Sequence, residues 1–171
     1  GGEGGGGGDD GEGGERSSVP AELRQGVDTI FSINWAFAAK LLDGSVVTCG
    51  DAVLGGESSS VHAALKPGFG TIFSTAWAFA AKLSDNNVVT WGDAGYGGDS
   101  SSVQAELKQG VDTIFSTNCA FAAKLLDGSL VTWGDADFGG ESSSVEAELK
   151  QGVDTIFSTA WAFADKLSDN N

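Results

Sequence analysis

The chain has 171 residues, enough for one ordinary domain with a sizeable core. It carries 9 Lys and Arg against 24 Asp and Glu, and this net charge of −15 disfavours binding to nucleic acids and to anionic membranes, both of which depend on basic side chains. The sequence shows no signal peptide and no apolar run long enough to span a membrane, so it predicts an intracellular protein, cytoplasmic or nuclear, whose protein partner is basic.

The first 15 residues contain only glycine and acidic residues, which cannot bury apolar area to offset the entropy lost on ordering. We therefore interpret residues 1–15 as a disordered linker that precedes a repeat region at 16–171. Methionine is absent from the whole chain, including position 1, which indicates a fragment of a longer protein.

The repeat region has a fixed period. Four valines of the motif Ser-Ser-Val, namely Val19, Val61, Val103 and Val145, each follow the last by 42 positions. Such a period indicates an array of stacked supersecondary units, none of which buries its apolar faces alone. We expect the open ends of this array to self-associate. The units are 17–58, 59–100, 101–142 and the incomplete 143–171.

One unit shows the expected elements in chain order. The stretch SSSVQAELKQG (100–110) predicts a short helix, with serine as N-cap and Gly110 near the C-cap. Three strands then follow, in VDTIFST (111–117), CAFAAKL (119–125) and SLVTWGD (129–135). The last two are joined by Asp127-Gly128, a dipeptide typical of tight hairpins. Both faces of the inner strands are apolar or small, which predicts antiparallel sheets packed between neighbouring sheets.

The segments IFST, AFAAKL and DGSLVTWGDADFGG resemble the repeat of the regulator of chromosome condensation family, here in a short form. The resemblance rests on Asp127-Gly128 and on the Trp-Gly pairs at 91–92 and 133–134. It implies an all-β fold with short helices, in which three- to four-stranded antiparallel blades form part of a β-propeller. The histidine of the family repeat is absent here.

The resemblance also implies three functions. We favour a non-catalytic protein-interaction or scaffold module. The alternatives are the substrate-recruiting region of a HECT-type ubiquitin ligase and a guanine-nucleotide exchange factor for a small GTPase.

Catalytic chemistry finds little support in the residues. The lone histidine, His62, falls on the predicted helix without a recurring nucleophile nearby, so it is interpreted as a surface substitution and the chain as a non-enzyme without a cofactor. Cys49 and Cys119 each occupy a slot that holds tryptophan in other units. They belong to different strands two units apart, which predicts buried, reduced thiols rather than a disulfide or a zinc site.

The loops GDAVLGGE, GDAGYGGD and GDADFGGE align acidic and apolar residues at recurring positions. Calcium binding is one reading of the acids, but each loop has too few carboxylates, so solvated turn acids are favoured and no metal is expected. The apolar residues either form a partner-binding rim or pack over their own blades, and we favour packing. The candidate partner-binding residues are Asp51, Leu54, Glu57, Asp93, Tyr96, Asp99, Asp135, Phe138 and Glu141.

Overall fold

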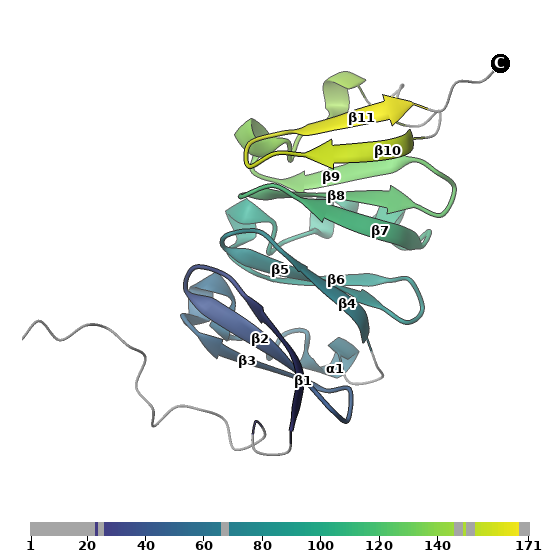
Figure 1. Ribbon diagram of the computed structural model, residues 1–171. Helices are drawn as coiled ribbons and strands as arrows, with labels where there is room; N and C mark the ends of the chain where they lie inside the picture. Colours follow the sequence, from purple (N-terminus) through teal and green to yellow (C-terminus); the bar gives the residue numbers. More distant parts are fainter. Residues whose placement is uncertain (1–22, 24–25, 66–68, 146–148, 150–152, 168–171) are drawn as a thin grey trace, which may run out of the picture.

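Figure 1 shows the computed structural model, which describes residues 23, 26–65, 69–145, 149 and 153–167. The strands form three three-stranded antiparallel sheets, here called blades 1 to 3, and a two-stranded sheet, blade 4. The fold is therefore all-β with short helices, as the repeat predicts. The predicted linker at 1–15 lies outside the described residues.

The element bounds follow the 42-residue period. The strands are β1 (Val27–Ser32), β2 (Ala36–Leu41), β3 (Val46–Gly50), β4 (Phe69–Ser74), β5 (Ala78–Leu83), β6 (Val88–Gly92), β7 (Val111–Ser116), β8 (Ala120–Leu125), β9 (Leu130–Gly134), β10 (Val153–Ser158) and β11 (Phe163–Leu167). The helical segments are η3 (Ala52–Gly56), α1 (His62–Leu65), η4 (Ala94–Tyr96), η5 (Ser101–Val103), α2 (Gln104–Leu107), η6 (Ala136–Phe138) and η7 (Ser143–Val145).

The blades stack face to face in an open arc of the β-propeller type (Figure 1). The first strand of each blade lies beside the first strand of the next, in the order β1, β4, β7 and β10. Backbone hydrogen bonds also join the turns at one end, where Ala76 N donates to Asn118 O over 2.8 Å and Asn118 N donates to Ala160 O over 3.0 Å. Each blade is therefore fixed mainly by its immediate neighbours.

Small side chains on the middle strands allow the blades to approach one another. Residues 78–81 of β5 and 120–123 of β8 are fully buried, and each stretch contains three alanines and one phenylalanine. The predicted burial of both faces is confirmed for these two strands. The hairpin turn is also confirmed, since Gly128 has a φ of 87°.

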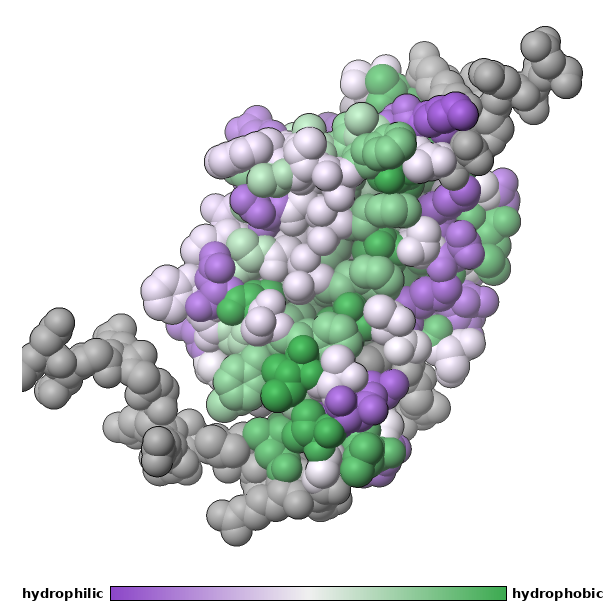
Figure 2. Space-filling view, viewed as in Figure 1, coloured by the Kyte–Doolittle hydropathy of each residue, from purple (hydrophilic) through white to green (hydrophobic). Residues whose placement is uncertain are grey.

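A recurring isoleucine of the first strand shows how much surface a neighbouring blade covers. Ile72, Ile114 and Ile156 are 4%, 3% and 6% exposed, because each faces the preceding blade. Ile30 occupies the same position in blade 1 and is 61% exposed. Figure 2 shows apolar surface gathered over this blade. Burial of this side chain thus depends on blade stacking, not on its own sheet.

A loop glycine from one blade contacts the aromatic core of the next. Gly97 has a φ of 102°, and a Cβ atom there would lie 2.5 Å from the ring of Phe121. That ring stacks on Trp133 with centroids 5.3 Å apart, and Trp133 Nε1 donates to Gly97 O over 3.1 Å. Blade 2 repeats the stack with Phe79 and Trp91, but Trp91 Nε1 has no hydrogen-bond partner.

The helix predicted at 100–110 is shorter than expected. It consists of the 3-10 turn η5 followed by the single α-helical turn α2. Ser100 occupies the N-cap position, as predicted, but its hydroxyl accepts from Thr90 Oγ1 over 3.1 Å and makes no cap bond. The carboxylate of Asp99, one residue earlier, accepts from Ser101 N over 2.8 Å.

The two isoleucine environments predict very different costs of truncation. We expect Ile114→Ala to lower the free energy of unfolding by about 2–5 kcal/mol, because it leaves a cavity between blades 2 and 3. The matched control Ile30→Ala changes exposed surface and should cost less than about 0.5 kcal/mol. Urea unfolding followed by circular dichroism measures both, and equal losses would contradict the observed stacking.

The two buried tryptophans provide a second matched pair. Trp133→Phe should cost about 1 kcal/mol more than Trp91→Phe, because only the first substitution removes an indole hydrogen bond and leaves a buried carbonyl without its donor. Both variants lose a similar volume, so the difference isolates the Gly97 contact. Thermal and urea unfolding of the two variants give the comparison; an equal or reversed order would show that the bond contributes nothing.

Candidate partner-binding rim

The first acidic residue of each loop holds the loop in shape. Asp93 Oδ1 accepts from Gly95 N and Asp135 Oδ1 accepts from Asp137 N, both over 2.9 Å. Asp51 Oδ1 accepts from the backbone of both Val53 (3.0 Å) and Leu54 (3.1 Å). All three aspartates are N-caps of the short helical turns η3, η4 and η6. Their role is thus structural, which the sequence interpretation as solvated acids missed.

The second acidic residue of each loop lies elsewhere, beside the third strand of its blade. Glu57, Asp99 and Glu141 are exposed and accept from the backbone N–H of the serine two positions later, over 2.6, 2.8 and 2.7 Å. These hydrogen bonds lower the pKa of all three carboxyls, with the backbone bond as the largest cause. The structure therefore divides the predicted acids into two sets with different surroundings.

The apolar residue of each loop is half-buried. Tyr96 packs against Trp77 of its own blade with ring centroids 5.9 Å apart. Phe138 stacks on Trp161 of the following blade at 5.0 Å. Leu54 is half-buried at the equivalent position in blade 1. The expected packing over the residue's own blade is thus found for Tyr96, whereas Phe138 packs against the next blade.

A threonine hydroxyl fixes two of these loops to the hairpin of their own blade. Thr117 Oγ1 accepts from Ala120 N over 3.0 Å and is 2.9 Å from Phe138 O, to which it donates. Thr75 makes the equivalent bond to Tyr96 O over 3.2 Å. Both threonines are buried. Their sequence signal is the Ser-Thr pair that recurs at the end of the first strand, at 74–75 and 116–117.

Large apolar side chains remain exposed among these loops. Trp35, Val53 and Trp161 are 58%, 69% and 64% exposed. Asp51 connects Trp35 and Val53 by hydrogen bonds: its N–H donates to Trp35 O over 3.0 Å, and its carboxylate accepts from Val53 N. We call the set of Trp35, Val53, Trp77, Tyr96, Phe138 and Trp161 the rim. The rim combines exposed aromatic surface with loops that internal hydrogen bonds hold in place.

The two cysteines and the histidine differ in burial. Cys119 is buried, and burial, followed by the charge of Asp135, raises the pKa of its thiol. Cys49 is unpaired as predicted but only half-buried, so its predicted burial is wrong; blade 1 has no described blade on its outer side. His62 is exposed at the start of α1, as predicted.

Across 26–65, 69–145 and 153–167, no three His, Cys, Asp or Glu side chains come together to hold a metal ion. In the same part of the chain no helix is long and apolar enough to cross a membrane.

Comparison with known proteins places the chain in no family. No protein-family model and no curated protein matches it. Among solved structures, the CRINKLY WD40 ectodomain of the Arabidopsis thaliana receptor kinase ACR4 aligns over 76% of this chain and 42% of its own, with 18% identity and a TM-score of 0.44. Human WBSCR16 aligns over 81% of this chain and 39% of its own, with 15% identity and a TM-score of 0.40. The chain thus spans about two fifths of either structure.

The lowered carboxyl pKa values predict acid sensitivity. A depressed pKa stabilises the fold above the ordinary carboxyl pKa of about 4, and this stabilisation is lost as the pH falls through the lowered value. Replacing Glu57, Asp99 and Glu141 by their amides keeps the acceptor oxygens and removes the charges. We expect the difference in Tm between the wild type and this triple variant to shrink between about pH 6 and pH 3. A difference that is independent of pH would contradict the assignment.

Proposed function

We propose that this chain is a non-catalytic protein-interaction module built from short repeats like those of the regulator of chromosome condensation family, and that it binds a basic protein partner through the rim. The observation that carries this proposal is the exposure of Trp35, Val53 and Trp161 among the loops. Exposed apolar patches with polar surroundings mark interaction sites, and tryptophan is enriched at protein interfaces.

The rim is suited to binding because its loops are held in one conformation before a partner arrives. Aspartate caps fix the start of each loop, and buried threonine hydroxyls fix the carbonyls of Tyr96 and Phe138. A surface that is already ordered loses less conformational entropy on association.

Charge supports a basic partner. The chain has a net charge of −15, and the acids Asp51 and Asp137 are exposed within the rim loops. Complementary charge speeds the encounter with a basic surface and disfavours an acidic one, whereas the aromatic side chains supply the contact area.

The test is selection of a random peptide library on the immobilised chain, followed by calorimetry with the enriched peptides. We expect them to be rich in Lys and Arg and to combine these with apolar residues. The double variant Trp35→Ser, Val53→Ser should weaken their binding by at least about tenfold, since exposed aromatic anchors dominate interface energies. Leu126→Ser is the control, because Leu126 is also 58% exposed but lies outside the rim. Equal losses in both variants would refute the rim as the binding surface.

A further inference from the structure

Blade 1 exposes an apolar face that later blades bury. Ile30 of β1 is 61% exposed, whereas the isoleucines at its position in blades 2 to 4 are 4%, 3% and 6% exposed. Val27 is 37% exposed, whereas its equivalents Val111 and Val153 are 0% and 2% exposed. Phe37 of β2 is half-buried, whereas the phenylalanines at its position in β5 and β8 are fully buried. We call this side of a blade, which faces the preceding blade, its front.

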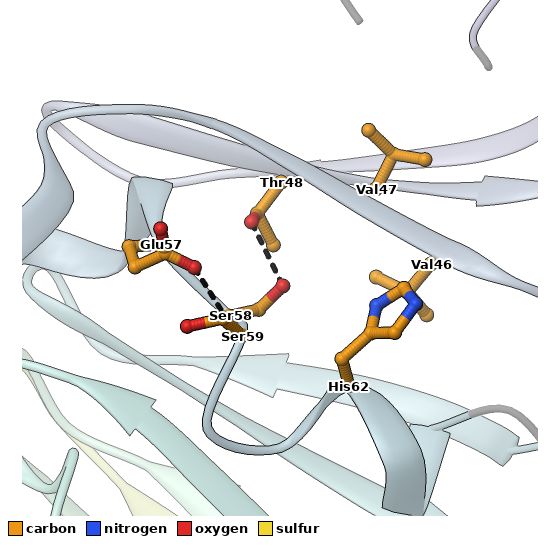
Figure 3. A pocket seen from close by; sticks show the side chains of 7 residues that line it. All are labelled: Val46, Val47, Thr48, Glu57, Ser58, Ser59 and His62. Carbon is orange, nitrogen blue, oxygen red and sulfur yellow. Dashed lines mark hydrogen bonds between the residues drawn. The ribbon is translucent and has the colours of Figure 1, made fainter.

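The third strand of blade 1 contributes to the same front. Val46 and Val47 point to opposite sides of β3 (Figure 3). Val46 packs in the core between blades 1 and 2, so Val47 points to the front of blade 1. Its equivalents Val89 and Val131 pack against the cores that blades 2 and 3 share with the blade before them. All three strands of blade 1 thus present apolar side chains on a face that no described blade covers.

The junctions within the chain define what such a front binds. Each of the three covered fronts packs on the opposite side, here called the back, of the preceding blade. In the junction between blades 2 and 3, the back contributes Phe73 from the first strand and the alanines Ala78 and Ala80 from the middle strand. They pack around Ile114 and Phe121 of blade 3. The surface that fits a front is therefore the back of another repeat.

Blade 4 carries a back of this kind that is exposed. Phe157 occupies the position of Phe73 and is 61% exposed, whereas Phe73 is half-buried against blade 3. Ala162 and Ala164 occupy the positions of the two alanines that blade 2 buries completely, and both are exposed. The described stack of blades therefore has one open front and one open back, with matching side chains.

We propose that two copies of the chain associate head to tail, with the back of blade 4 in one copy packed on the front of blade 1 in the other. Both faces are apolar, so the contact buries the same kind of surface that joins successive blades. Formed twice, it closes two copies into a ring of six three-stranded and two two-stranded blades. A third copy would exceed the roughly 4 to 8 blades of β-propellers, so the pair is the end point.

This contact is weaker than a junction within one chain. Within the described residues, blade 4 has no third strand and no loop glycine to take the place that Gly97 has against Phe121. Each copy also carries a net charge of −15, which opposes association. Salt screens this repulsion, with a Debye length of about 10 Å at 0.1 M, and leaves the apolar contact intact. Self-association therefore strengthens as salt rises, whereas binding of a basic partner weakens.

Analytical ultracentrifugation of the full chain over a range of protein concentrations tests the proposal. We expect the mean mass to rise from that of one chain to that of two and to stop there. The rise should occur at lower protein concentration in about 1 M than in about 0.1 M sodium chloride.

Two variants address the two faces separately. Ile30→Asp and Phe157→Asp should each weaken dimerisation at least about tenfold, because each places a charge in the apolar contact. Both side chains are exposed in the single chain, so the fold is retained, and neither residue belongs to the rim. An equimolar mixture of the two variants should associate more strongly than either alone. In the mixture the unchanged back of the Ile30→Asp copy fits the unchanged front of the Phe157→Asp copy.

Leu42→Asp is the matched control. Leu42 is 71% exposed, and its equivalent Leu126 remains 58% exposed although blade 3 has a neighbour on both sides. The position therefore lies outside the junction, and this variant should dimerise like the wild type.

Four results would overturn the proposal. A single-chain mass at every concentration would exclude self-association, and growth beyond two chains would exclude the closed pair. If Phe157→Asp dimerised normally while Ile30→Asp remained monomeric, two fronts would be in contact and head-to-tail packing would be wrong. An equal loss in Leu42→Asp would attribute the effect to added charge and not to the junction.

Discussion

The contact between a loop glycine and the phenylalanine of the next blade determines how the repeats stack. At Gly97 a side chain would need space that the ring of Phe121 already fills, and the positive φ of the glycine is one that other residues rarely adopt. The same glycine supplies the carbonyl that Trp133 binds. Gly139 lies against Phe163 in the same way one blade later, so one backbone position joins successive blades at a fixed separation.

Because this separation is small, several positions on the middle strands have room for a small side chain only. Alanine occupies three of the six positions in each of β5 and β8, while the bulk of the core in blades 2 and 3 comes from one phenylalanine and one tryptophan per blade. The polar residues of the loops also have structural roles, since aspartates cap the turns and threonines donate hydrogen bonds to loop carbonyls. The large apolar side chains left exposed include Trp35 and Trp161 of the rim.

Periodicity in the sequence predicted the strands, the hairpin turns and the burial of both faces, because these follow from alternation and from turn chemistry. It did not reveal the cap made by Asp93, the bond that Asp99 accepts from Ser101 N, or the bond from Thr117 to the Phe138 carbonyl. These bonds depend on the path of a loop in space, which no alternation of residue types encodes. The positions of the candidate residues along the chain follow from the repeat, whereas the capping role of Asp93 and the packing of Tyr96 depend on the folded loop.

The indole nitrogen of Trp91, buried without an acceptor, has a consequence for how the array comes apart. The junction between blades 1 and 2 lacks a hydrogen bond that the junction between blades 2 and 3 possesses. In an array where each module contacts only its neighbours, separation begins at the weakest junction and proceeds stepwise. Under a pulling force or partial denaturation, we expect blade 1 to separate from blade 2 more readily than blade 2 separates from blade 3.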